Sequence, residues 1–322
     1  MGDAHLGFAS PQQPLDLDAY ELRLRRWSAM AVGLFAKHFG RQLAASAAGV
    51  APLLERFCDD PGGLDRAFSP AIGEVRFALL TRFADEQQSL GAAAALALAL
   101  AAEGWPARMR LQFSSAAQLV FDRYALPASR ALELDSNGSS ARIVAEGHGV
   151  LELSRGADGW HAPPSDGVTV LPRIASARPV VVLPRLPALI PLPPGAALGA
   201  LDGVSASCEA ALELVQRFAP SYLPWIARGV ANIVPLRTPP GSTSSASFDQ
   251  LPRVVALTAQ APALDVAELL VHEASHQHVF MLTSVCGPVD DGSDRRLYPS
   301  PIKKAERPID KILLAYHAVA NM

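Results

Sequence analysis

The sequence predicts an α+β protein with a helical N-terminal layer, a β-rich middle and a C-terminal region built on an HExxH helix and a following helix. Apolar residues recur with helical spacing between about residues 17 and 104. They alternate with polar residues between 108 and 190 and return to helical spacing in the last third of the chain. We therefore expect a helical region over 1–105, a β-rich region over 106–195 and a metal-site region over 196–322, forming one or two compact domains.

The helical region is expected to begin with an amphipathic run from Asp18 to His38, whose apolar residues fall near one face. The sequence Asp59–Gly63, which contains proline and glycine, ends this pattern. Two more helical stretches follow, around 73–83 and 87–103. The alanine-rich stretch Gly91–Ala102 is shorter than the roughly 20 apolar residues that span a bilayer. It is therefore predicted to be a buried helix.

Strands are predicted where polar and apolar residues alternate, as in Met109–Phe113 and Ala141–Ala145. The pairs Asn137-Gly138 and Asp158-Gly159 indicate turns between such strands. The proline-heavy stretch Pro184–Pro194 cannot lie in a central strand, because proline has no N–H to donate. We place the main boundary of the chain in this stretch.

The last third is predicted to combine helices with a strand. We expect a helix from about Ser205 to Phe218, a polar loop from Pro239 to Ser247, a strand from Arg253 to Thr258 and a helix from about Leu264 to Thr283. The apolar helical pattern then reaches Met322 without a terminating glycine, proline or basic residue. We therefore expect the natural chain to continue beyond this residue.

The composition is that of an ordinary globular protein, with 50% hydrophobic and 18% charged residues over 322 positions. A net charge of −3 gives no basic field to attract nucleic acid or an anionic membrane, so neither is an expected partner. The three cysteines are widely spaced without a CxxC pair, which argues against a disulfide framework and a thiolate metal site. No signal-peptide pattern opens the chain, so we expect a cytoplasmic location.

The motif that carries chemistry is His272-Glu273-Ala274-Ser275-His276, an HExxH sequence within the predicted helix 264–283. A spacing of four residues places both imidazoles on one helix face, one turn apart, so they can share one metal ion. Glu273 then sits beside the open side of that ion. The alternative interpretation is that both histidines are ordinary core or solvated helix residues. His278 points to another face, so we expect it to support the site or lie at the surface.

A catalytic metal needs a third protein ligand, which the HExxH helix itself does not offer within three further turns. His317 lies in an apolar helical stretch, where a histidine is either a hydrogen-bonded core residue or a ligand. The carboxylate alternatives are Asp290, Asp291, Glu306 and Asp310.

Four segments of the last third resemble a known family. They are Ser242–Ser247, Val254–Leu257, Leu269–His276 and Tyr298–Pro301 leading to Arg307-Pro308. In order and spacing they are similar to the HExxH-type peptide-modifying proteins of modified-peptide biosynthesis, which are 2-oxoglutarate-dependent peptide β-hydroxylases. The likeness is good from about Ile233 to Met322 and general elsewhere. The chain departs from the family where an aromatic residue and an arginine often follow the Ser-Pro pair, since Ile302-Lys303-Lys304 stand there.

This resemblance implies an Fe(II) oxygenase with 2-oxoglutarate as cosubstrate and a ribosomally made precursor peptide as substrate. It favours His317 as the third metal ligand, because the other upstream histidines lie outside the region of likeness. Three protein ligands leave three metal positions for bidentate 2-oxoglutarate and O2. Glu273 would then hydrogen-bond beside the metal.

The distal carboxylate of 2-oxoglutarate needs a fixed cation, and the planar fork of arginine suits a carboxylate. We choose Arg307 for this role, with Tyr298 and Ser245 as further candidates to line the pocket. The lesser candidates for the cation are Arg253, Arg295 and Arg296.

Two other functions compete with the oxygenase. In a zinc peptidase, Glu273 would be the general base that deprotonates metal-bound water. In a metal-free peptide-binding relative, the fold would persist without chemistry.

Overall fold

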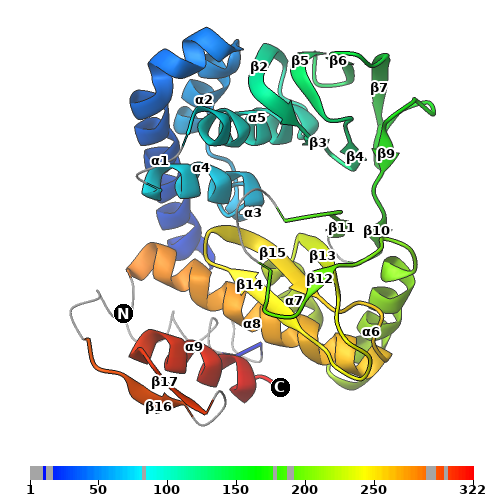
Figure 1. Cartoon of the computed structure of the whole chain (residues 1–322). Coiled ribbons are helices and arrows are strands. Elements are labelled where there is room, and N and C mark those ends of the chain that lie inside the picture. The colour runs from blue at the N-terminus through cyan, green and yellow to red at the C-terminus, as the bar shows by residue number, and fades with distance from the viewer. Residues whose placement is uncertain are drawn as a thin grey trace. The chain divides into compact units, whose positions relative to one another are not determined.

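The computed structural model describes residues 10–11, 17–81, 85–176, 180–186, 192–287, 295–300 and 304–322. It confirms the α+β class, with helices at the N-terminal end, strands in the middle and helices at the C-terminal end (Figure 1). Asp290 and Asp291, two of the carboxylate alternatives for a metal ligand, lie outside the described residues.

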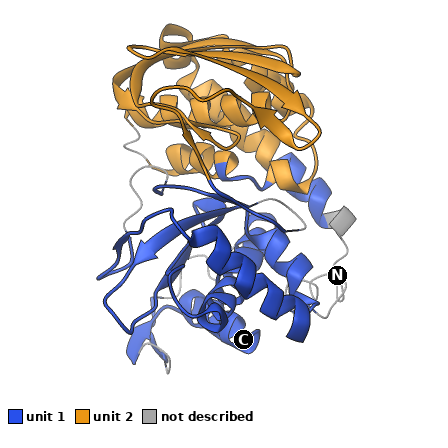
Figure 2. Ribbon diagram, turned by 90° about the vertical axis from the view of Figure 1, so that its right-hand side faces the viewer, with its two compact units in different colours: residues 1–27, 68–70, 172–322 blue, residues 28–67, 71–171 orange. Residues whose placement is uncertain are grey.

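The chain divides into two compact units, shown in different colours in Figure 2. Unit 1 holds Met1–Trp27, Phe68–Pro70 and Pro172–Met322, and unit 2 holds Ser28–Ala67 and Ala71–Leu171. The long C-terminal part of unit 1 therefore begins at Pro172, ahead of the proline-heavy stretch in which we placed the boundary. Unit 2 joins most of the predicted helical region to much of the predicted β-rich region.

The N-terminal helices follow the predicted pattern and include one short helix of 4 residues. They are α1 (Leu17–Ser46), α2 (Val50–Asp59), α3 (Leu64–Ala67), α4 (Pro70–Leu80) and α5 (Glu86–Ala102). The break predicted at Asp59–Gly63 separates α2 from α3. Helix α5 begins with a capping box, in which Asp85 accepts from the Gln88 N–H while Gln88 accepts from the Asp85 N–H. Most of α5 is buried, as predicted for the alanine-rich stretch.

Unit 2 contains a six-stranded antiparallel sheet in the order β1-β2-β5-β6-β7-β8. Its strands are β1 (Ala47–Ala48), β2 (Ala107–Ala117), β5 (Ser129–Ser136), β6 (Ser140–Ala145), β7 (Val150–Gly156) and β8 (Gly159–His161). Burial alternates along β2 and β6, as the alternating sequence predicts, so one face of the sheet is buried. A small sheet of β3 (Val120–Phe121), β4 (Tyr124–Ala125) and β9 (Thr169–Val170) completes the unit.

Unit 1 is built on a mixed sheet in the order β10-β11-β13-β15-β14, with a short extra strand beside β13. Its strands are β10 (Arg173–Ile174), β11 (Val180–Val182), β12 (Ala197–Leu198), β13 (Asn232–Arg237), β14 (Ser245–Phe248) and β15 (Leu251–Leu257). Strands β11, β13 and β15 run parallel, and every residue of β15 is buried. The predicted loop Pro239–Ser247 ends inside β14, because its last residues pair with β15.

Helices α6 (Val204–Phe218), α7 (Tyr222–Gly229) and α8 (Ala263–Cys286) form one core with this sheet. They match the two predicted helices and add α7, a short helix. Helix α8 contacts α6, α7, β14 and β15. Gly229 allows α7 to approach α8 closely, since an added Cβ would lie 3.1 Å from the Cα and carbonyl oxygen of Ala274. Ala274 is the small residue inside the HExxH motif.

The C-terminal part of unit 1 consists of the hairpin β16 (Tyr298–Ser300) and β17 (Ala305–Arg307), followed by α9 (Ile309–Ala320). Helix α9 contacts both α8 and β16. The hairpin and α9 are therefore attached to the helix that carries the motif.

Among the described helices, none is both long enough and apolar enough to cross a membrane.

Candidate metal centre

The two motif histidines converge on one face of α8. Their Nε2 atoms lie 3.1 Å apart, and their rings meet edge to face at 4.6 Å between centroids. Among the described residues, His272, Glu273 and His276 form a group of side chains that could hold a metal ion, with ligand atoms within 4.8 Å of one another. The helical spacing of four residues produces this arrangement, as the sequence predicts.

The distance between the two Nε2 atoms suits a shared metal ion. Two nitrogens about 2.1 Å from one ion, at angles of about 90° to 110°, lie roughly 3.0–3.4 Å apart. The Oε1 atom of Glu273 lies 3.9 Å from the Nε2 of His272. That separation would need an angle of about 135° at the ion, wider than either common geometry allows. The donor set therefore fits two histidine ligands, with Glu273 beside them.

Glu273 is almost completely buried, with 1% of its surface exposed. Burying a carboxylate is unfavourable unless opposite charge or hydrogen-bond donors compensate for the lost hydration. A divalent cation between His272 and His276 would provide such a charge. The burial of Glu273 thus agrees with a metal at this position.

His278 lies on another face of α8, in a fully buried contact with Trp225 of α7. Their rings stack at 3.6 Å between centroids, and the Nε2 of His278 lies 3.1 Å from the carbonyl oxygen of Trp225. Since a carbonyl oxygen only accepts, Nε2 carries the proton. Burial lowers the pKa of His278 to about 3, so the ring is neutral. His278 therefore joins α8 to α7, in keeping with the expected supporting role.

His317 of α9 also lies near Trp225. Its ring is 6.2 Å from that of Trp225 and inclined by 29°. The group of close ligand atoms does not include it. The structure thus brings His317 to a neighbour of the motif helix, while its role as third ligand stays a prediction.

The end of α9 lies beside the motif. The sulfur of Met322 is 3.4 Å from the Nδ1 of His272, and buried Asn321 donates from Nδ2 to the carbonyl oxygen of His317 at 2.9 Å. A helix rises about 1.5 Å per residue, so His317 is roughly 4.5 Å along the axis from Ala320, whereas Asp310 is roughly 15 Å away. Among the rival ligands on α9, this placement favours His317.

Asp310 has a local partner at the far end of α9, where the Nζ of Lys311 lies 3.1 Å from its carboxylate. Glu306 is exposed on β17. Neither carboxylate is in the group of ligand atoms around His272 and His276.

Two of the predicted 2-oxoglutarate residues face each other across the C-terminal hairpin. Tyr298 on β16 is the register partner of Arg307 on β17, and both are half-buried. Arg307 precedes the start of α9 by two residues, so one connected segment carries it together with His317. The guanidinium of Arg296 lies 5.6 Å from the centre of the Tyr298 ring. Ser245 is on β14, a strand that contacts α8.

Arg253, a lesser candidate for the cosubstrate cation, is committed to packing. It is buried, its Nη2 donates to the carbonyl oxygen of Ala227 at 3.2 Å, and its backbone N–H donates to Oε1 of Gln277 at 2.8 Å. Its φ of 62° lies in the left-handed region, which is uncommon for a residue other than glycine. Arg253 therefore fixes the end of α7 and α8 against β15.

Sequence reasoning missed Trp225 and Gln277. Gln277 donates from Nε2 to the carbonyl oxygen of Val254 at 3.2 Å while it accepts from Arg253, so it anchors α8 to the sheet. The position of Gln277, directly after the second motif histidine, is a signal in the sequence that could have found it. Trp225 gave no such signal, because its contacts come only from tertiary packing.

No protein-family model matches the chain, and no curated protein matches it either. The likeness to the HExxH-type peptide-modifying proteins therefore stays a prediction drawn from its four segments.

Proposed function

We propose that this protein is an Fe(II)- and 2-oxoglutarate-dependent oxygenase that hydroxylates the β-carbon of a residue in a ribosomally made peptide. The observation that carries the proposal is the 3.1 Å approach of the His272 and His276 Nε2 atoms beside buried Glu273. The segment with Tyr298, Arg307 and His317 is attached to the same helix through α9.

Each residue has a defined task in this proposal. His272 and His276 hold the metal and His317 completes the ligand set, while Glu273 places a negative charge beside the metal. Arg307 binds the distal carboxylate of 2-oxoglutarate through its planar fork, with Tyr298 beside it. Bound Fe(II) supplies the oxidative chemistry, in which 2-oxoglutarate and O2 become succinate and CO2 as one oxygen atom enters the substrate C–H bond.

An edge strand of the unit 1 sheet supports the proposal of a peptide substrate. Strand β14 stands at the end of the described strand order, runs antiparallel to β15 and contacts α8. An edge strand can pair its backbone with an extended peptide, which gives affinity without restricting the peptide's side chains. A peptide added along β14 would thus be held next to the motif helix.

A second candidate is a zinc peptidase, which the position of Glu273 favours. Its Oε1 lies 3.9 Å from the Nε2 of His272, close enough to accept a proton from water bound at the same metal. The peptide-binding argument applies equally to this function.

The test is to reconstitute the protein with Fe(II) without oxygen, add 2-oxoglutarate and admit O2. We expect succinate to form, faster when the substrate peptide is present, and mass spectrometry should find a peptide heavier by one oxygen atom. Cleavage of peptide by the zinc-loaded protein without any need for O2 would favour the peptidase. Failure to bind any divalent metal would leave only a peptide-binding function.

A further inference from the structure

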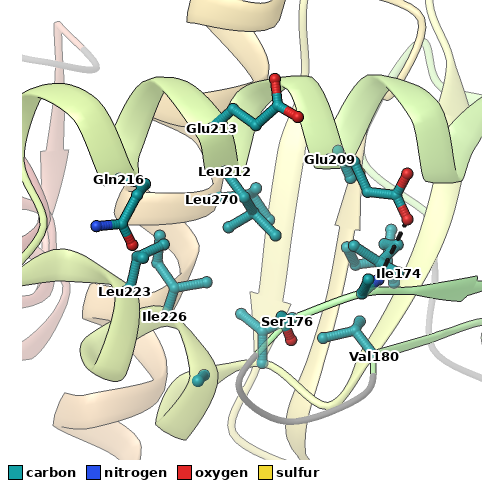
Figure 3. A pocket seen from close by; sticks show the side chains of 15 residues that line it. Ile174, Ser176, Val180, Glu209, Leu212, Glu213, Gln216, Leu223, Ile226 and Leu270 are labelled. Atoms are coloured by element: carbon teal, nitrogen blue, oxygen red, sulfur yellow. Dashed lines mark hydrogen bonds between the residues drawn. The ribbon is translucent and has the colours of Figure 1, made fainter.

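Unit 1 also contains a concave site away from the motif histidines, a pocket of about 530 Å³ between α6, α7 and the sheet. Its size falls in the range of small-molecule sites, which is roughly 300–1,000 Å³. Figure 3 shows Leu212 and Leu270 at its centre, Leu223 and Ile226 at one end and Val180 at the other. The pocket therefore opens beside the main apolar core of unit 1.

The pocket is separate from the metal centre. Leu270 of α8 lines it, and His272 follows two residues later. Each residue of a helix turns by about 100°, so two residues turn by about 200° and the two side chains leave α8 about 160° apart. A ligand in the pocket would contact the opposite side of the motif helix from the candidate metal.

The rim on α6 is acidic. Glu209 and Glu213 both line the pocket, and the Oε1 of Glu209 accepts from the Ala175 N–H at 3.2 Å (Figure 3). Glu213 is exposed and has no hydrogen bond or ion pair within the described chain. Arg217 follows one turn later on α6, but its guanidinium lies over the ring of Phe218, 5.0 Å from the centroid. The described residues that line the pocket include no lysine or arginine, so among them nothing neutralises Glu213.

The floor of the pocket is mostly apolar. Cys208 is fully buried there, and desolvation raises the pKa of its thiol to about 12, so it stays protonated and behaves as a small apolar group. A ligand that matches both parts of the site has an apolar body for the floor and a positive end that stays hydrated at the rim.

We propose that this pocket binds an organic cation with an elongated apolar body that ends in a protonated amine or a guanidinium. This proposal does not rest on the metal or on the oxygenase function. The same chemistry occurs in a free alkylamine and in a peptide that carries leucine-like residues next to lysine or arginine. The two sources are separated by the choice of probe.

The test compares three probes with the same apolar body, octylamine, octanol and octanoate, by calorimetric titration of the metal-free full chain at neutral pH and low salt. We expect octylamine to bind most tightly and octanoate at least about tenfold more weakly, because two partly exposed carboxylates contribute to the difference. Equal dissociation constants for octylamine and octanol would overturn the proposal.

Variants assign the binding to this pocket. Glu213→Gln and Glu209→Gln should each raise the dissociation constant of octylamine about two- to fivefold and leave octanol unchanged. Glu268→Gln, the same change at an exposed position of α8 outside the lining, is the matched control. Leu212→Trp should fill the hollow and weaken octylamine and octanol alike by about tenfold, since the apolar body loses its burial. Leu223→Phe serves the same purpose if circular dichroism shows that Leu212→Trp does not fold.

Competition experiments then decide whether the cation comes from a free amine or a peptide. Octylamine competes with an acetylated tripeptide of two leucines and one lysine, and the same tripeptide with norleucine in place of lysine is the control. Displacement of octylamine by the lysine peptide alone would assign the pocket to a peptide segment. Octylamine binding without such displacement would assign it to a free amine. Octylamine binding that neither the glutamate variants nor the cavity-filling variants change would place it elsewhere and refute the proposal.

Discussion

The two units bury different kinds of polar side chain. In the described part of unit 2 the buried polar residues are all serines: Ser28, Ser89, Ser129 and Ser136. Unit 1 buries Arg253, Glu273, Gln277 and His278, which are large, charged or titratable. Such groups are unfavourable in a core unless each is compensated, so the packing around α8 depends on specific polar contacts, such as those of Arg253, Gln277 and His278.

The charged side chains of the unit 2 sheet, by contrast, lie at its surface. The open face of the unit 2 sheet carries cross-strand ion pairs between Arg108 and Asp135, Arg110 and Glu133, and Arg142 and Glu152. Exposed pairs of this kind contribute little to stability. Polar interactions should therefore have large effects in unit 1 and small effects in unit 2, and four predictions test this difference.

The largest effect is expected at the metal centre. His272→Ala or His276→Ala should abolish stoichiometric binding of a divalent metal, because the remaining ligands are too few to hold it. Elemental analysis of protein purified without chelators measures this directly. His148→Ala, an exposed histidine of unit 2, is the control and should keep the metal content. Full metal occupancy in both motif variants would remove the basis of the proposed function.

The next effect concerns the support of α8. His278→Ala should lower the free energy of unfolding by about 2–4 kcal/mol, because it leaves a cavity against Trp225 and removes a buried hydrogen bond. Ser136→Ala in unit 2 should change it by about 1 kcal/mol or less. Chemical denaturation of both variants gives the comparison. Similar losses for the two would show that the buried polar groups of the units do not differ in importance.

How far the sequence predicts these features depends on their range along the chain. The helical period and the HExxH spacing predict α8 and the convergence of His272 with His276, since both are local. Alternation likewise predicts the unit 2 strands. The strand order of unit 1 could not be predicted, because its parallel neighbours are not consecutive in the chain: β12 lies between β11 and β13, and β14 lies between β13 and β15.

The contacts around the site could not be predicted from the sequence either. The left-handed φ of Arg253 occurs without glycine or asparagine to indicate it, and its partner Gln277 is 24 residues away. The stack of Trp225 on His278 joins residues 53 apart in the chain. Such contacts arise from packing of whole elements, which residue patterns within one segment do not encode.

A smaller effect is expected at the predicted cosubstrate cation. Arg307→Ala should raise the Michaelis constant for 2-oxoglutarate about tenfold or more and leave metal content unchanged, since it removes a charge-assisted contact and no ligand. Succinate formation at varied 2-oxoglutarate measures it, with Arg130→Ala, at an exposed position of β5 in unit 2, as the control. An unchanged constant in Arg307→Ala would transfer the role to Arg295 or Arg296, because Arg253 is held by Ala227.

The smallest effect is expected on the exposed sheet face of unit 2. Arg142 and Glu152 face each other on β6 and β7, 3.3 Å apart, with 53% and 64% of their side chains exposed. Solvent and salt screen such a pair, so Glu152→Gln should lower the free energy of unfolding by about 0.2–1 kcal/mol and leave metal content unchanged. The loss should shrink further in about 1 M salt, where charges interact over only about 3 Å. Denaturation at two salt concentrations tests this, and a loss as large as that of His278→Ala would contradict the expected difference between the two units.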